Sequence, residues 1–290
     1  MAPRRAHGVF RRGELAIEGV SLAGDETWFR LHPPGLALDA GRGSQSLAGT
    51  ADLFLSHGHL DHALGVPYLL SQRTLHHRSP TRVFCPAGIA DDLRALVAAA
   101  GRLERIEYRW ELVALEPGDR CELGRGFTLE AFATDHVVPG LGAHLLRTRK
   151  RLRPGFVGLE REAIAAERRR GVAVEEEFEE LWLSYCGDTG AGVWESAPAI
   201  DRSRVLMLEC TFLGEALRGR GAAFGHLHFD DLVEHRQRLA GHELVVLHHL
   251  SRRHHPGELR AEVDRRLPEL AARIHVWGEP GGSPGSGERT

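Results

Sequence analysis

Three short apolar runs open the chain, and a turn signal separates each from the next. Residues 14–20, 27–31 and 36–39 are rich in aliphatic and aromatic side chains, with Gly24-Asp25 and Pro33-Pro34-Gly35 between them. Gly, Pro and Asp favour the backbone angles of tight turns, so this pattern predicts three strands of a meander.

Strand-like and helix-like segments then alternate along the rest of the chain. Leu64, Tyr68 and Leu69 recur at helical spacing, which predicts a helix over residues 63–73. The same reasoning predicts helices over residues 90–100, 160–170, 230–240 and 256–271, and strands over residues 82–85, 106–115, 127–132, 181–185, 205–209, 243–247 and 274–277. Such alternation favours a layered α/β domain with its functional site at strand ends.

The organisation of the chain follows from these segments. We expect an N-terminal extension (1–13), one domain over residues 14–278, and a disordered tail (279–290) rich in Gly, Ser and Pro. Within the domain, residues 147–180 show no regular periodicity apart from one helix, and we interpret them as an irregular insert.

Composition and charge narrow the class of protein. The 290 residues are 42% hydrophobic, which is enough for a large core, and no apolar run is as long as a membrane span, so we expect a cytoplasmic protein. A net charge of -3 argues against non-specific nucleic-acid binding. The basic stretch 147–153 could contact phosphates or form a solvated charged loop. The four cysteines form no Cys-x-x-Cys pair, and we expect buried free thiols.

The strongest chemical signal follows the apolar run 53–55. His57, His59, Asp61 and His62 lie within six residues after a predicted buried strand, so they occupy a loop at a strand end. Imidazole and carboxylate ligands together suit zinc, manganese or iron. Asp39 ends an earlier strand, where it either orients one of these histidines or forms a turn.

The His-x-His-x-Asp-His stretch resembles the signature of the metallo-β-lactamase-fold hydrolases. Asp135-His136, followed by a Val-Pro-Gly turn, resembles the ribonuclease Z branch of that family, as does the stretch 151–156. The resemblance makes His136 a metal ligand. We find no Gly- and Pro-rich extended arm of the kind that holds tRNA in many ribonuclease Z enzymes.

Two later elements resemble the same branch in the same order. Gly-Asp-Thr at 187–189 is similar to the family's Ser-Gly-Asp-Thr element, whose aspartate bridges two metals, so Asp188 takes that role. Glu-Cys-Thr-Phe at 209–212 is similar to Glu-Ala-Thr-Phe, whose glutamate supports a catalytic histidine.

The last two elements carry paired histidines. Gly-His-Leu-His at 225–228 resembles Gly-His-Ser-Thr, so His226 is the catalytic histidine, while His228 could replace it, bind substrate or cap a helix. Leu-His-His-Leu-Ser at 247–251 resembles Leu-Thr-His-Phe-Ser, which makes His249 a ligand and places His248 at the Thr position.

The resemblance implies a single-domain four-layer αβ/βα sandwich and a homodimer. It implies two divalent metal ions, Zn²⁺ first with Mn²⁺ or Fe²⁺ as alternatives, held respectively by His57, His59, His136 and Asp188, and by Asp61, His62, Asp188 and His249. In this interpretation water between the ions becomes the attacking hydroxide, Asp61 orients it, and His226 backed by Glu209 protonates the leaving oxygen.

Several functions remain open at this point. The first is phosphodiester hydrolysis in tRNA 3'-end processing. The second is hydrolysis of a small phosphodiester such as a cyclic nucleotide, which the missing arm favours, or of another ester or sulfate ester. The third is a metal-binding scaffold without turnover, which has no need of Asp61, His226 and Glu209.

Overall fold

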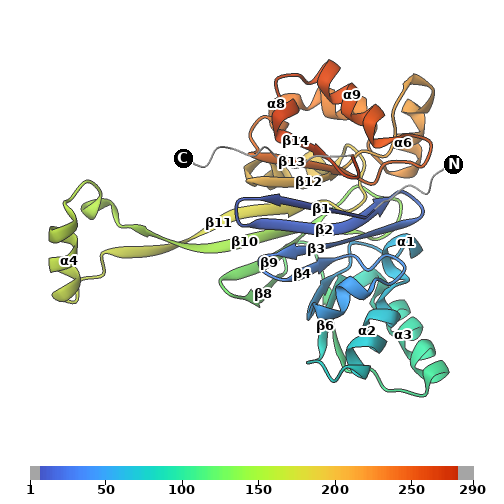
Figure 1. Cartoon of the computed structure of the whole chain (residues 1–290), viewed down its shortest axis with the longest axis horizontal. Coiled ribbons are helices and arrows are strands. Elements are labelled where there is room, and N and C mark those ends of the chain that lie inside the picture. The colour runs from blue at the N-terminus through green and yellow to red at the C-terminus, as the bar shows by residue number, and fades with distance from the viewer. Residues whose placement is uncertain (1–6, 280–290) are drawn as a thin grey trace.

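The computed structural model describes residues 7–279. Two mixed β-sheets pack face to face, and helices cover the outer face of each sheet (Figure 1). This arrangement confirms the predicted four-layer αβ/βα sandwich. None of the helices in the described residues is long and apolar enough to cross a membrane.

The first sheet contains seven strands in sequence order. They are β1 (His7–Arg12), β2 (Leu15–Leu22), β3 (Glu26–His32), β4 (Leu36–Leu38), β5 (Asp52–Phe54), β6 (Thr81–Pro86) and β7 (Trp110–Leu115). Strands β1 to β4 are antiparallel, and β4 to β7 are parallel. Strand β1 lies inside the expected N-terminal extension and pairs with β2, so this part of the extension belongs to the sheet.

The second sheet has the order β14-β13-β12-β11-β10-β9-β8. Its strands are β8 (Arg120–Gly124), β9 (Phe127–Ala133), β10 (Leu141–Leu152), β11 (Glu175–Tyr185), β12 (Val205–Glu209), β13 (Leu244–His248) and β14 (Ile274–Val276). Strands β8 to β11 are antiparallel, and β11 to β14 are parallel. Strands β8 and β10 were not predicted.

The α-helices are short, and several differ from the prediction. They are α1 (Leu60–Ala63), α2 (Val66–Leu75), α3 (Ala90–Glu104), α4 (Arg161–Arg169), α5 (Val193–Ser196), α6 (Arg218–Phe224), α7 (Phe229–Glu234), α8 (Arg236–Leu239) and α9 (Pro256–Arg266). The expected helix 63–73 is divided at Gly65, where a Cβ atom would lie 2.1 Å from the Ala40 carbonyl oxygen. Helix α9 ends before Pro268, which cannot donate a helical hydrogen bond.

Three apolar clusters hold the layers together. The central cluster lies between the sheets and contains the buried Phe29, Phe54 and Tyr185. A second cluster packs the second sheet against α7 and α9, and a third packs the first sheet against α2 and α3. Cys85, Cys186 and Cys210 are buried free thiols as expected, whereas Cys121 is partly exposed. The tail 280–290 lies outside the described residues.

Strands β10 and β11 extend beyond the body of the molecule as a two-stranded arm with α4 at its tip (Figure 1). Residues 147–180, which we interpreted as an irregular insert, thus contain two strands and a helix. The chain has an extended arm, although the sequence shows no Gly- and Pro-rich one. The arm has no apolar alternation to reveal it in the sequence. Instead, a mostly basic row, residues 147–151, faces a mostly acidic row, residues 176–180, and three of the five cross-strand pairs join a basic residue to a glutamate.

Ion pairs cross the arm between these two rows. Arg151 Nε lies 2.8 Å from Glu176 Oε1, and Lys150 Nζ lies 3.5 Å from Glu177 Oε1. Both pairs are largely exposed, so each contributes little to the free energy of unfolding. Their larger consequence is that the basic stretch 147–153 is partly neutralised by the facing glutamates.

Candidate metal centre

Loops at strand ends of both sheets meet at one edge of the sandwich. The loop after β5 carries His57 and His59, and the loops after β9, β11 and β13 carry His136, Asp188 and His249. Gly187 allows a close approach between two of them: its φ is 60°, and a Cβ atom there would lie 2.7 Å from Ser56 Cβ. A larger residue would force the Asp188 loop away from the histidine loop.

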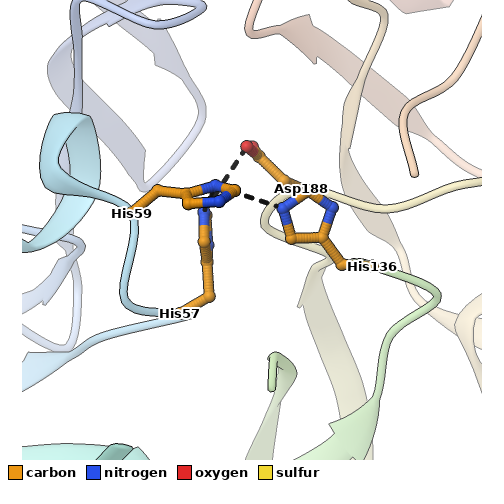
Figure 2. A group of neighbouring side chains, drawn as sticks. All are labelled: His57, His59, His136 and Asp188. Carbon is orange, nitrogen blue, oxygen red and sulfur yellow. Dashed lines mark hydrogen bonds and ion pairs between the residues drawn. The ribbon is translucent and has the colours of Figure 1, made fainter. Parts of the chain in front are cut away.

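One group contains His57, His59, His136 and Asp188, whose polar atoms converge in Figure 2. His59 Nδ1 lies 3.1 Å from His57 Nε2 and 3.3 Å from His136 Nε2. His57 Nε2 also lies 3.6 Å from Asp188 Oδ2. Three imidazoles and a carboxylate thus face a common point from three separate loops.

A second group meets the same oxygen atom of Asp188. Oδ2 of that residue lies 3.4 Å from His62 Nε2 and 3.3 Å from His249 Nε2. The two histidine nitrogens lie 3.3 Å apart, and Asp61 Oδ2 is 3.6 Å from His249 Nε2. All seven predicted metal-ligand residues therefore belong to one cluster, with the carboxylate of Asp188 at its centre.

Hydrogen bonds on the outer side hold three of the rings in place. His62 Nδ1 donates to Asp39 Oδ2 over 2.8 Å, and His136 Nδ1 donates to the Gly225 carbonyl over 2.8 Å. His249 Nδ1 donates to Thr211 Oγ1 over 3.0 Å. Each bond fixes the ring orientation and leaves the inner nitrogen available as a ligand, as is common for metal-binding histidines.

Asp39 accepts several of the hydrogen bonds that surround the ligand histidines. This agrees with one of its two predicted roles, the orientation of a histidine. It is fully buried and accepts hydrogen bonds from the Ser56 amide, the Ser56 hydroxyl and the Tyr185 hydroxyl, in addition to His62. The Ser56 hydroxyl in turn lies 2.9 Å from His57 Nδ1. The roles of Ser56 and Tyr185 were not predicted. The sequence indicates them only by placing a polar side chain at the end of each of two buried strands.

The cluster suits metal ions on structural grounds. Asp188 is 3% exposed, and its Oδ1 atom is buried without a hydrogen-bond partner in the described residues. Burial raises the pKa of Asp188, but the charges of His249 and His62 outweigh it and hold the pKa well below its usual value. A buried, ionised carboxylate needs adjacent positive charge, and the mixed nitrogen and oxygen donors suit Zn²⁺, Mn²⁺ or Fe²⁺.

His226 and Glu209 lie beside the cluster and form a further candidate ligand group with Asp188 and His249. His226 Nδ1 is 2.7 Å from Glu209 Oε1, and the His226 ring stacks on the His249 ring at 5.3 Å. Burial lowers the pKa of His226, but the neighbouring Glu209 carboxylate raises it to about 9. The Thr189 amide also donates to Glu209, so this carboxylate is fixed in place by the Asp188 loop.

The two histidines whose roles were open or unassigned lie outside the cluster. His228 caps α7: its Nδ1 accepts from the Asp230 amide, and its Nε2 donates to the Gly214 carbonyl. His248 is buried and stacks on Tyr185, and neither ring nitrogen has a partner in the described residues. Of the three roles considered for His228, helix capping is the one that the structure supports.

Comparisons with known proteins agree with this architecture. Residues 34–249 match the family model of the beta-lactamase superfamily domain. A solved metallo-beta-lactamase fold protein, YhfI from Bacillus subtilis, superposes with a TM-score of 0.56 at 16% identity, covering 85% of this chain and 90% of that one. The fold and the matched domain define a metal-dependent hydrolase of the beta-lactamase superfamily.

Similarity to individual sequences places the chain within that superfamily. It is 30% identical over 263 residues to the chloroplastic tRNase Z TRZ2 of Arabidopsis thaliana, covering 89% of this chain and 74% of the relative. The short form of human tRNase Z superposes with a TM-score of 0.51 at 17% identity, over 84% of this chain and 88% of that one. The chain belongs to the tRNase Z family.

Proposed function

We propose that the protein hydrolyses a phosphodiester bond of precursor tRNA near its 3' end. The observation that carries the proposal is the position of the hydrogen-bonded His226 and Glu209 beside Asp188. The Asp188 Oδ2 atom in turn lies within 3.6 Å of a ring nitrogen of His57, His62 and His249. A proton donor next to a site for two cations suits hydrolysis of an anionic ester, and a scaffold without turnover has no use for it.

We assign the ligand residues to two ions, Zn²⁺ first. His57, His59, His136 and Asp188 would hold one, and Asp61, His62, His249 and Asp188 the other. Bound there, divalent ions lower the pKa of water and neutralise charge on the attacked phosphate. The chain supplies the remaining functions through side chains whose positions are fixed by hydrogen bonds.

Asp61 is suited to orient the attacking water by accepting a hydrogen bond from it. Burial raises its pKa, but the hydrogen bond with His249 and the charge of His62 outweigh it, so the pKa is lowered and the carboxylate is ionised at neutral pH. The Gly24 amide donates to Asp61 Oδ2 over 2.8 Å, which holds the carboxylate in the site.

His226 is suited to protonate the leaving oxygen. With its pKa raised to about 9 by Glu209, the imidazole carries a proton at neutral pH. After it releases that proton, the Glu209 carboxylate favours its return. This pair therefore acts as a general acid without drawing on the ligand residues.

The arm favours tRNA over a cyclic nucleotide as the substrate. A small molecule needs no contacts beyond the metal centre, whereas the arm carries α4 far from the body (Figure 1). In the described part of the chain, Arg161 and Arg169 of α4 have no acidic partner and are free to contact phosphates. In this proposal the paired strands of the arm, whose charges offset one another, act as a spacer. Helix α4 at the tip of the arm provides the contact with the phosphates of tRNA.

Single-turnover cleavage of a 3'-extended precursor tRNA by zinc- or manganese-loaded protein tests the proposal, with a cyclic nucleotide assayed in parallel. We expect cleavage next to the acceptor stem, its loss in His226→Ala, and an intact cyclic nucleotide. An opened cyclic nucleotide beside an intact tRNA would reassign the protein to small phosphodiesters, and inertness toward both would contradict phosphodiester hydrolysis.

Two further predictions accompany this function. We propose a homodimer, which light scattering during gel filtration tests directly. We also propose a cytoplasmic location, which cell fractionation would check.

A further inference from the structure

Helix α6 lies next to the metal centre, although none of its residues belongs to the ligand groups. The helix ends at Gly225, whose carbonyl accepts the hydrogen bond from His136 Nδ1. Gly225 has a φ of 65°, and a Cβ atom there would lie 3.1 Å from the Val137 amide nitrogen. The end of α6 and the His136 loop are therefore in direct contact.

An aromatic ring stands exposed at this contact. Phe224, the last residue of α6, is 50% exposed, and Val137, directly after His136, is 60% exposed. Leu60, directly after His59, is 62% exposed. Three large apolar residues next to site residues in the sequence are therefore exposed to solvent. Ligand sites commonly combine apolar side chains with a few polar groups, so these residues are candidates for contact with a ligand.

A cation accompanies the ring. The guanidinium carbon of Arg220 lies 5.3 Å from the centre of the Phe224 ring. Within residues 7–279, no carboxylate forms an ion pair with Arg220. Arg218 on the same helix, by contrast, forms ion pairs with Asp230 and Glu234. An exposed ring with an unneutralised guanidinium beside it is suited to a flat, anionic ligand.

We propose that Phe224 is a stacking platform for a nucleobase next to the scissile phosphodiester, and that Arg220 binds a phosphate of the same nucleotide. The inference rests on the proposed function, which brings a single-stranded nucleotide to the metal centre. Aromatic rings stack on any base, because every base offers a flat face. Arginine complements the ring because it binds phosphate and packs on aromatic faces.

Fluorescence quenching tests the platform without any need for turnover. The probe is 2-aminopurine riboside 5'-monophosphate, titrated with metal-loaded protein. We expect quenching by the wild-type protein and by Phe224→Tyr, and about tenfold weaker binding by Phe224→Leu, which keeps apolar area but lacks a ring. Leu103→Ala is the matched control, because Leu103 is an exposed apolar residue of α3.

The phosphate contact has its own readout. Arg220→Gln should weaken binding of the monophosphate but leave binding of the unphosphorylated riboside unchanged. Absence of quenching by the wild-type protein, or equal quenching by Phe224→Leu, would overturn the inference. Cleavage of precursor tRNA is scored separately: cleavage without Phe224-dependent quenching overturns the platform alone, and quenching without cleavage supports the platform and contradicts the proposed function.

Discussion

The metal centre and the arm both consist mainly of charged and polar residues, yet they are held together in different ways. At the metal centre, His57, His62 and Asp188 are almost completely buried, and most of their polar atoms have a fixed partner. On the arm, opposite charges face each other in solvent, as in the pair of Arg151 and Glu176.

The effect of a charged residue on function therefore depends on whether it is buried or exposed. In the interior, a carboxylate changes the protonation of its neighbours strongly because water screens little. On the exposed arm, water and salt screen each pair, so single pairs matter little and the rows act through their sum. Substitutions in the two regions should therefore differ greatly in effect.

The largest effect is expected at Asp188. Asp188→Asn keeps the shape but removes the charge shared by both ligand groups, so we expect metal content to fall and cleavage to slow by about 10³-fold or more. Metal analysis and single-turnover cleavage measure both. Asp91→Asn is the control, because the Asp91 side chain is 97% exposed. Full metal content in Asp188→Asn would contradict the bridging role.

The next effect concerns the acid pair and its pH dependence. Because Glu209 raises the pKa of His226 to about 9, activity that needs protonated His226 should persist up to about pH 9 and fall above it. In Glu209→Gln the raising charge is lost, so the alkaline limb should move to lower pH. A pH profile of single-turnover cleavage measures this, and an unmoved limb would show that Glu209 does not act through His226.

The third prediction concerns His144, a buried residue outside the metal centre, and the pH dependence of the free energy of unfolding. Burial lowers the pKa of His144 to about 4, below its value of about 6.5 in an unfolded chain. Between these two pH values the unfolded state therefore binds more protons than the folded state. The free energy of unfolding should fall by about 3 kcal/mol as the pH is lowered from above 6.5 toward 4.

Urea denaturation of chelator-treated protein at several pH values measures that loss. His144→Gln should show a shallower dependence of the free energy of unfolding on pH. His76→Gln, at an exposed position, should keep the wild-type slope. Identical slopes in wild type and His144→Gln would rule out the contribution of His144.

The smallest effect is expected on the arm. Glu176→Gln removes the partner of Arg151, and we expect the free energy of unfolding to change by less than about 1 kcal/mol, with the difference shrinking at high salt. Urea denaturation at low and high ionic strength measures it. A change of more than about 2 kcal/mol would mean that arm pairs behave like interior ones.

The same contrast explains what could be predicted from the sequence. His57, His59, Asp61 and His62 follow an apolar strand as one compact motif, so their chemistry and their place at a strand end were recognisable from the pattern. His136, Asp188 and His249 lie apart from that motif in the sequence, and only the resemblance to a known family singled them out. The arm was missed because its strands carry rows of like charge, which show no apolar period. Tyr185 and Thr211 were missed because their roles depend on partners far away in the chain, Asp39 and His249.

The central claim is that two ions share Asp188. Anomalous X-ray scattering from crystals of zinc-loaded protein tests it most directly. We predict two peaks on either side of the Asp188 carboxylate, one among His57, His59 and His136, and the other among Asp61, His62 and His249. A single peak, or peaks away from Asp188, would contradict the account.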